Sequence, residues 1–298
     1  MKPTLTVFTP TFNRKDCLRR CYASLTAQTC RDFIWLVIDD GSTDGTGAMV
    51  KEWMDEGKLA LRYHYQENGG MHAAHNAAYE RIDTELNVCI DSDDQMPEDA
   101  VASILEFWAK HRGQRMAGFA GLDADAATGG IIGLPFAGDA LETTLTGYYA
   151  GGGRGDKKLV YRTELMQSLP PYPVFPGEKY VGLGYKYMLA DQIAPLLTMN
   201  KILCLVEYRA DGSSLNMFRQ YVRNPRGFAF LRREGMRLQP TGRRRYIEAA
   251  HYVSASLLAK NQRWLQDSPR PWLTLAALPP GLAFLALILW KNRNPNNA

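Results

Sequence analysis

The 298-residue sequence predicts an α/β fold with a mostly parallel central sheet, followed by a basic helical extension. Over the first 125 residues, short apolar runs alternate with segments that carry apolar residues at helical spacing. This alternation is typical of parallel strands joined by helices. Between Arg209 and Arg270 there are 13 Lys or Arg residues and four Asp or Glu residues, although the net charge of the whole chain is only +4. The rest of the chain is therefore net negative, and the sequence predicts an acidic front part and a basic back part with different roles.

The expected elements follow in a regular order. Apolar runs predict strands at 5–9, 33–39, 59–65, 86–91 and 116–122. Helical spacing predicts helices at 16–28, 42–55, 71–81 and 97–111, with Ser42 and Pro97 as start signals. From about residue 126 to 155 glycine is frequent and the pattern weakens. Beyond it we expect a helix at 178–197, a strand at 201–208 and helices over 216–265.

Polar residues follow each of the first four expected strands. The motifs are Thr9-Pro10-Thr11-Phe12-Asn13-Arg14, Asp39-Asp40-Gly41-Ser42-Thr43-Asp44, Asn68-Gly69-Gly70 and Asp91-Ser92-Asp93-Asp94. Ligands of an open parallel sheet bind beyond the carboxyl ends of its strands, so we expect the four motifs to meet. Each motif alone is also consistent with simple capping of the next helix.

The fourth motif favours a metal site. Three carboxylates within four residues repel one another, and an apolar strand leads directly into them. Asp91 and Asp93 are two residues apart, which places them on the same side of an extended strand end. Hard oxygen ligands of this kind suit Mg²⁺ or Mn²⁺, which also bind phosphate oxygens. A solvated acidic loop is the alternative interpretation.

Together with His75-Asn76, these motifs resemble the family 2 glycosyltransferases of GT-A fold in order and spacing. Two later segments, Gly177–Val181 and Tyr208–Gly227, resemble a bacterial subgroup that makes surface polysaccharides such as teichuronic acid or capsule. The resemblance implies a catalytic domain at 1–215, with a nucleotide-binding half at 1–125 and an acceptor-binding half at 126–215. Residues 216–298 would then form the helical basic extension.

The resemblance also implies a role for each matching residue. Asp91 and Asp93 would hold a Mn²⁺ or Mg²⁺ cofactor. Glu178 would be the catalytic base, although Lys179 follows it where the family more often has Asp, and a helix-start carboxylate is the alternative role. Asp94 would be a second catalytic carboxylate that orients a sugar. The nucleotide would contact Thr9, Thr11, Asp39, Asp40, Gly69, Gly70, Asn76 and Asp91, with Asp40 accepting a hydrogen bond from the base.

These roles imply an inverting, metal-dependent glycosyltransferase of the hexosyltransferase type. It would move a sugar from a nucleotide-diphosphate sugar, UDP-linked, to a glycan or lipid-linked glycan acceptor in the cell envelope. Two alternatives remain open. The acceptor could be polyprenyl phosphate, whose phosphate oxygen needs no general base, so that Glu178 would be dispensable. The chain could also be a non-catalytic, membrane-attached scaffold of a glycan assembly complex.

The back half suggests a membrane-associated protein. The basic stretch Arg232–Arg245 suits an anionic membrane surface, and no recognised nucleic-acid module is present, so we expect no nucleic-acid partner. The segment 273–290 is uncharged, but it is short for a membrane span and Pro279-Pro280-Gly281 should break it. We expect peripheral attachment or a homo-oligomer contact there. Five cysteines without a C-x-x-C pair and the lack of a signal sequence favour the cytoplasm, at the inner membrane face.

Overall fold

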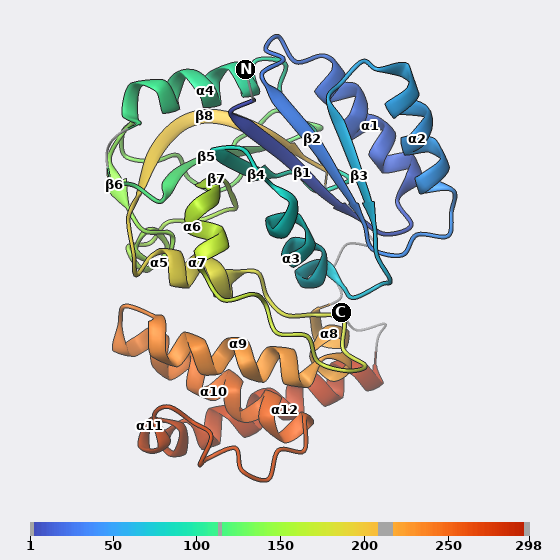
Figure 1. Cartoon of the computed structure of the whole chain (residues 1–298). Helices are drawn as coiled ribbons and strands as arrows, with labels where there is room; N and C mark the ends of the chain where they lie inside the picture. Colours follow the sequence, from blue (N-terminus) through green and yellow to red (C-terminus); the bar gives the residue numbers. More distant parts are fainter. Residues whose placement is uncertain (1–2, 113–114, 208–216, 295–298) are drawn as a thin grey trace. The chain divides into compact units, whose positions relative to one another are not determined.

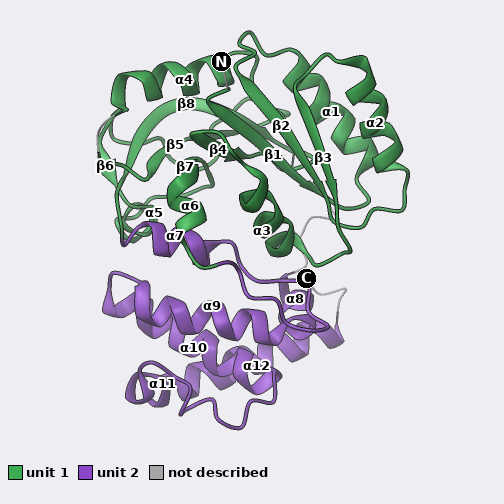
Figure 2. Cartoon of the chain, in the orientation of Figure 1, with its two compact units in different colours: residues 1–170, 193–208 green, residues 171–192, 209–298 purple. Residues whose placement is uncertain are grey.

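The computed structural model describes residues 3–112, 115–207 and 217–294. The chain divides into two compact units (Figure 2). The first comprises Met1–Pro170 and Ile193–Tyr208, and the second comprises Pro171–Gln192 and Arg209–Ala298. The expected domain boundary at residue 215 and the Asp211–Ser214 part of the subgroup resemblance lie outside the described residues. The domain assignment therefore stays a prediction.

An eight-stranded sheet forms the frame of the first unit (Figure 1), in the order β3-β2-β1-β4-β7-β5-β8-β6. Its strands are β1 (Leu5–Thr11), β2 (Phe33–Asp39), β3 (Leu61–Tyr65), β4 (Leu86–Cys89), β5 (Gly118–Asp125), β6 (Glu142–Thr143), β7 (Lys157–Arg162) and β8 (Leu196–Val206). Strands β3, β2, β1 and β4 are parallel, as are β5 and β8. Strand β7 lies antiparallel between β4 and β5, and β6 is antiparallel to β8. The predicted mostly parallel sheet is confirmed.

Helices cover both faces of this sheet. They are α1 (Lys15–Thr26), α2 (Thr46–Glu56), α3 (Met71–Arg81), α4 (Ala100–His111), α5 (Leu145–Ala150) and α6 (Thr163–Ser168). On one face, Leu18 of α1 and Trp53 of α2 join Val7 of β1 in a buried cluster. The next residue of β1, Phe8, contacts Tyr79 of α3 edge to face, with ring centroids 5.7 Å apart. Because side chains alternate along a strand, α3 covers the opposite face.

All the elements expected before residue 125 are present, and α3 begins and ends where the sequence predicts. Helix α2 starts at Thr46 rather than after Ser42. Gly41 and Gly45 adopt φ of 89° and 87°, values that a right-handed helix does not allow, so the helix begins only after Gly45. The helix predicted at 178–197 is wrong. Only α7 (Gly184–Ala190) forms within it, and β8 already begins at Leu196. Glycines at 182 and 184 weaken helix formation at the start of this segment.

The described part of the second unit is helical. After α7 come α8 (Met217–Arg223), α9 (Pro225–Leu238), α10 (Gly242–Leu258), α11 (Pro271–Ala276) and α12 (Leu278–Arg293). Phe228 and Ile288 are buried in one cluster, and Met236 and Tyr252 in another. The expected break is present but falls at Ala277, between α11 and α12, because the prolines occupy the first turn of α12, where no backbone N–H is needed. None of the described helices is both long and apolar enough to cross a membrane.

Candidate functional site

The loops after β1 and β2 are joined at the carboxyl edge of the sheet. Asn13 N donates to Ser42 Oγ at 2.9 Å, and Asn13 Oδ1 accepts from Thr43 N at 2.8 Å. Asn13 has φ of 51°, a left-handed conformation that Asn tolerates. In the parallel register Thr11 lies opposite Asp39. The first two sequence motifs therefore meet, as expected for neighbouring parallel strands.

The carboxylate of Asp40 is fully engaged within the chain. Its Oδ1 accepts from Gln66 Nε2 at 2.7 Å and from Gly69 N at 2.8 Å. Its Oδ2 accepts from Gly70 N at 2.7 Å and from Asn68 Nδ2 at 3.1 Å. A carboxylate has about four acceptor positions, so none is left over. Asp40 thus fixes the loop before α3, and direct contact with a nucleotide base would require one of these donors to move.

Three further predicted nucleotide contacts lie close to the same edge. The Oδ2 of Asp39 accepts from Tyr63 OH at 2.8 Å. The hydroxyl of Thr9 accepts from Trp35 Nε1 at 3.0 Å and so belongs to the hydrophobic core. The hydroxyl of Thr11 is buried, and no described residue hydrogen-bonds it. Of the two threonines, Thr11 is thus the one whose hydroxyl no described residue hydrogen-bonds.

The start of α3 carries the other predicted nucleotide contacts. Gly70 is the N-cap with φ of 91°, and a Cβ at Gly69 would lie 2.6 Å from Ala73 Cβ. Only glycine therefore fits at Gly69 without a shift of the helix. His72 is buried, neither ring nitrogen has a hydrogen-bond partner among the described residues, and burial lowers its pKa. Asn76 lies one turn further along α3 and is half-buried.

The acidic motif follows β4. Asp94 is buried, and its Oδ2 accepts from Cys204 Sγ at 3.5 Å and its Oδ1 from Glu207 N at 3.3 Å. Burial raises the pKa of Asp94 to about 7 and also raises the pKa of Asp91. Asp93 is half-buried. The carboxylates of Asp91 and Asp94 are thus poorly hydrated, and the positive charge near them does not fully offset the effect of this burial on their pKa values.

Two residues outside the predicted motifs belong to this acidic cluster. Asp123 of β5 is buried, its Oδ1 has no hydrogen-bond partner among the described residues, and burial raises its pKa. The charge of Lys158 lowers the pKa values of Asp91, Asp94 and Asp123 against that effect. Lys158 lies on β7, the antiparallel strand between β4 and β5. The signal in the sequence is a pair of lysines directly before the short apolar run Leu159–Tyr161.

The donor set fits a hard divalent cation. Asp91 and Asp93 supply carboxylate oxygens, the ligand type that Mg²⁺ and Mn²⁺ prefer. The raised pKa of half-buried Asp91 and the unpartnered Oδ1 of buried Asp123 both indicate negative charge that a cation would stabilise. Among the described residues, no group of three or more His, Cys, Asp or Glu side chains could hold an ion.

Glu178 belongs to the second unit, where it caps the start of α9. Its Oε1 accepts from Arg226 N at 3.1 Å and from Arg226 Nε at 2.9 Å. Its Oε2 accepts from Gly227 N at 2.8 Å. The side chain is buried, and α9 begins at Pro225. The observed position therefore matches the helix-start alternative, although the helix is α9 rather than one that Glu178 itself begins.

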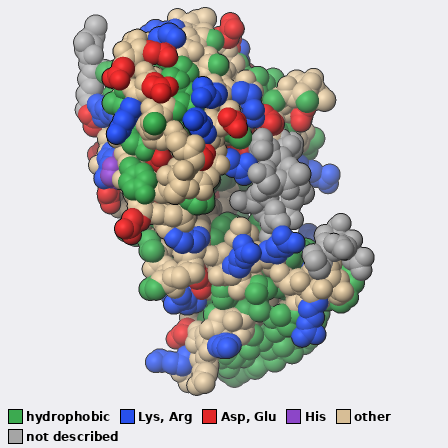
Figure 3. Space-filling view, turned by 90° about the vertical axis from the view of Figure 1, so that its right-hand side faces the viewer, with side chains coloured by type: hydrophobic (Ala, Val, Ile, Leu, Met, Phe, Trp, Pro, Cys, Tyr) green, Lys and Arg blue, Asp and Glu red, His purple; other side chains and the backbone are tan. Residues whose placement is uncertain are grey.

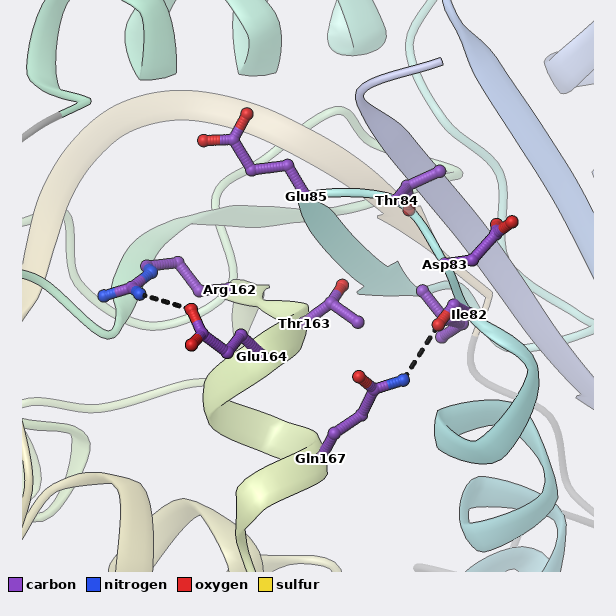
Figure 4. A pocket seen from close by; sticks show the side chains of 8 residues that line it. All are labelled: Ile82, Asp83, Thr84, Glu85, Arg162, Thr163, Glu164 and Gln167. Carbon is purple, nitrogen blue, oxygen red and sulfur yellow. Dashed lines mark hydrogen bonds and ion pairs between the residues drawn. The ribbon is translucent and has the colours of Figure 1, made fainter. Parts of the chain in front are cut away.

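A hollow of about 290 Å³ lies on the first unit near the start of β4 and the end of β7 (Figure 4). It is lined by Ile82, Asp83, Thr84, Glu85, Arg162, Thr163, Glu164 and Gln167. Arg162 Nη2 pairs with Glu164 Oε2 at 3.1 Å, and Gln167 Nε2 donates to Ile82 O at 2.8 Å. Because β4 runs from here towards the acidic motif, this hollow is at the opposite strand end from the predicted site and contains none of its residues.

Comparison with known proteins identifies the first part of the chain. Residues 6–128 match the family model described as Glycosyl transferase family 2. Glycosyltransferase GlyA of Streptococcus pneumoniae is 34% identical over 102 residues, and a teichoic acid poly(glycerol phosphate) polymerase of Staphylococcus epidermidis is 28% identical over 103 residues. Each match covers 34% of this chain and only 14% of the relative. The resemblance drawn from the motifs is confirmed.

Solved structures extend the likeness in fold to nearly the whole chain. Residues 1–349 of S. aureus TarS in complex with UDP-GlcNAc superpose with a TM-score of 0.66 at 18% identity, over 98% of this chain and 92% of that one. The mannosyltransferase PcManGT of Pyrobaculum calidifontis, in complex with GDP-Man and Mn²⁺, gives 0.57 at 17% identity, over 96% and 88%. At such identity these likenesses establish the fold alone. The predicted GT-A fold is confirmed.

Proposed function

We propose, starting from the family 2 glycosyltransferase domain at residues 6–128, that this protein is an inverting glycosyltransferase of bacterial surface-polysaccharide synthesis. It moves a sugar from a UDP-linked donor to a glycan or lipid-linked glycan acceptor. The observation that carries the proposal is the convergence of the strand-end motifs at one edge of the sheet, with buried carboxylates and unpartnered polar atoms among them. Similarity to a teichoic acid polymerase supports the polysaccharide context.

The donor's nucleotide binds where β1, β2 and α3 meet. Thr11 offers a buried hydroxyl without a partner among the described residues, and Asp39 lies opposite it in the neighbouring strand. Asp40 acts by holding Gly69 and Gly70 in place, so that the backbone there can approach the nucleotide. The structurally similar TarS binds UDP-GlcNAc, which supports a uridine nucleotide in the donor. PcManGT, also similar in fold, binds GDP-Man, so a GDP-sugar is the competing donor to be tested.

Asp91 and Asp93 would hold Mn²⁺ or Mg²⁺. When bound, such an ion neutralises charge on the departing diphosphate. Around it the chain's own residues exclude water, since Asp94 is buried and hydrogen-bonded to Cys204 and Glu207. Asp94 is thereby fixed in one orientation, as a residue that positions a sugar requires.

Glu178 is the proposed general base. It would take the proton from the acceptor hydroxyl as that oxygen attacks the anomeric carbon, and a single displacement of this kind inverts the configuration. Three of its roughly four acceptor positions are occupied by N–H groups, which leaves one on Oε2 for the acceptor. The same occupancy favours a second candidate, transfer to polyprenyl phosphate, whose oxygen needs no base. The scaffold alternative remains for a chain that turns over no donor.

A panel of nucleotide sugars tests the proposal. The full chain is incubated with UDP-, GDP- and dTDP-sugars and Mn²⁺, and both the melting temperature and the release of nucleoside diphosphate are measured. We expect a UDP-sugar to raise the melting temperature and to be turned over with an oligosaccharide or lipid-linked acceptor. Turnover only with polyprenyl phosphate favours the second candidate. If no donor raises the melting temperature and none releases a nucleoside diphosphate, the non-catalytic scaffold becomes the favoured hypothesis. We place the enzyme at the cytoplasmic membrane face, where lipid-linked acceptors are made.

A further inference from the structure

The C-terminal helices present an exposed apolar face. It comprises Tyr246, Ile247, Trp272, Leu275, Leu282, Leu287, Leu289 and Trp290, with exposures from 39% at Tyr246 to 84% at Trp272. Tyr246 OH reaches Ala276 O at 3.4 Å, which joins α10 to the end of α11. Figure 3 shows hydrophobic side chains gathered on the C-terminal unit, in the lower part of the view, with Lys and Arg beside them. Soluble proteins rarely expose so many large apolar side chains together without a function for them.

Helix α12 is apolar on both of its sides. On the inner side Ile288 is buried, and Gly281 O accepts from Ser254 Oγ of α10 at 2.8 Å. On the outer side Leu282, Leu289 and Trp290 recur at helical spacing and are exposed. A helix that is hydrophobic all round is normally covered all round. The outer side of α12 is therefore suited to apolar surroundings.

The charges beside this face are basic. Many arginines of the predicted basic stretch are engaged inside the unit, such as Arg232, which pairs with Glu248 at 3.1 Å. Four arginines on or next to α10–α12 are exposed, namely Arg243, Arg263, Arg270 and Arg293, although Arg270 Nε donates to Met236 O at 2.9 Å and Arg263 Nε lies 4.0 Å from Asp267 Oδ1. The acidic residues in the described span of these helices and their connections are Glu248 and Asp267. The surroundings of the apolar face thus carry net positive charge.

We propose that the apolar face inserts into the interfacial region of an anionic phospholipid bilayer, with α12 lying along the membrane plane. Trp272 and Trp290 are the aromatic residues expected at such an interface, and the arginines meet the headgroups. A second copy of the chain fits less well, because a symmetric contact through this face would bring the same arginines together. The proposal goes beyond the transfer reaction and does not depend on it.

Vesicle flotation with the full chain tests this proposal. Vesicles of phosphatidylcholine alone are compared with vesicles that also contain phosphatidylglycerol, at low and at high NaCl. The face variant carries Trp272→Gln, Leu287→Gln and Trp290→Gln. The control variant carries Met54→Gln, Val174→Gln and Ile193→Gln, three apolar residues that are 43–59% exposed elsewhere. Deletion of 273–298 is avoided because it would remove buried Ile288. Circular dichroism and light scattering report the fold and the oligomeric state.

We expect the wild type and the control variant to float with phosphatidylglycerol vesicles, and the face variant to lose about tenfold or more in partitioning, equivalent to 1.4 kcal/mol or more. High salt should weaken the binding only in part, because apolar insertion is not screened. Failure of the wild type to float at low salt would overturn the proposal. The proposal would also be overturned if the folded face variant floated as well as the wild type, or if the wild type were a dimer that the face substitutions dissociate. Flotation needs no donor sugar, so its failure is distinct from failure of the proposed transferase activity.

Discussion

The substitution Glu178→Gln separates two roles of one carboxylate. In the structure Glu178 caps α9, whereas the proposed mechanism also uses it as the base. Gln has the same shape but offers one oxygen and one NH₂ group. The oxygen can replace Oε1 and keep both donors of Arg226. The NH₂ group would then face Gly227 N–H, so that this hydrogen bond is lost.

The expected loss of stability follows from these contacts. A hydrogen bond to a charged group contributes about 1.5–3 kcal/mol, and the attraction between a carboxylate and a helix N-terminus about 0.3–1 kcal/mol. Since Gly227 and Glu178 are both buried, water cannot replace the lost partner. We therefore expect Glu178→Gln to lower the free energy of unfolding of the helical unit by about 2–4 kcal/mol. Glu178→Ala, which loses all three bonds, should cost more.

Urea unfolding and hydrogen exchange at the first turn of α9 measure the cap, and initial rates with saturating donor measure the catalysis. Thr241→Ala is the matched control, because Thr241 caps α10 in the same unit by accepting from Arg244 N at 3.3 Å. It should cost about 0.5–2 kcal/mol and leave transfer unchanged. If Glu178 is also the base, Glu178→Gln should reduce transfer by about 10²-fold or more while donor affinity is kept.

Two results would refute parts of this reasoning. An unfolding free energy within about 0.5 kcal/mol of the wild type would show that the carboxylate does not hold α9 as the geometry indicates. Full transfer activity in a destabilised but folded Glu178→Gln protein would confine the residue to the cap. The latter result would also favour polyprenyl phosphate as the acceptor.

The other predictions concern the acidic cluster and the helical unit. Asp93→Ala should abolish turnover and weaken Mn²⁺ binding in calorimetry while the fold persists; normal turnover would contradict the metal assignment. Lys158→Met removes the positive charge that lowers the pKa values of Asp91, Asp94 and Asp123, and should lower the melting temperature at neutral pH; Lys158→Arg should recover part of this loss and Mn²⁺ should reduce it, whereas an unchanged melting temperature would show that this charge does not stabilise the cluster. Burial, with help from Arg232, lowers the pKa of His251 to about 4, so stability should fall as the pH drops from about 6.5 towards 4, by at most about 3 kcal/mol. His251→Asn should flatten this pH dependence, and an unchanged slope in urea unfolding would assign it to other groups.

Local patterns predicted the first half of the sheet because its signals are local. Strand β2 is apolar up to its last residue, Asp39, and is buried throughout, and α3 matches its predicted ends. The later part depends on contacts between distant residues. Strand β7 enters the sheet antiparallel between β4 and β5, and nothing within Lys157–Arg162 specifies those neighbours. Lys158 was missed for this reason, since its relation to the acidic motif comes from strand order and not from sequence spacing.

The sequence predicted which residues form the candidate site but not which contacts each of them makes. A count of carboxylates cannot distinguish Asp40, whose oxygens are saturated by its own loop, from Asp39, which lies beside it. The same holds for Glu178, whose partners lie 48 and 49 residues further along the chain. In both cases the motif predicted a site residue, and that stays a prediction, whereas the hydrogen-bond partners depend on the folded arrangement of the loops.

The unpartnered atoms of the first unit give a more specific indication of ligand position than the charged motifs do. A buried polar group without a hydrogen bond is costly, so folded proteins rarely retain one unless something else binds it. Thr11 is the last residue of β1, His72 lies in the first turn of α3, and Asp123 lies near the carboxyl end of β5. Strand β7 is antiparallel to both β4 and β5, so β5 runs in the same direction as β4 and β1. All three lie towards the same edge of the sheet, although they come from different strands and loops. A donor nucleotide bound at this edge, as proposed, would hydrogen-bond Thr11 and His72, whereas the Asp123 carboxylate requires a cation or an N–H or O–H donor, because an anionic phosphate would repel it.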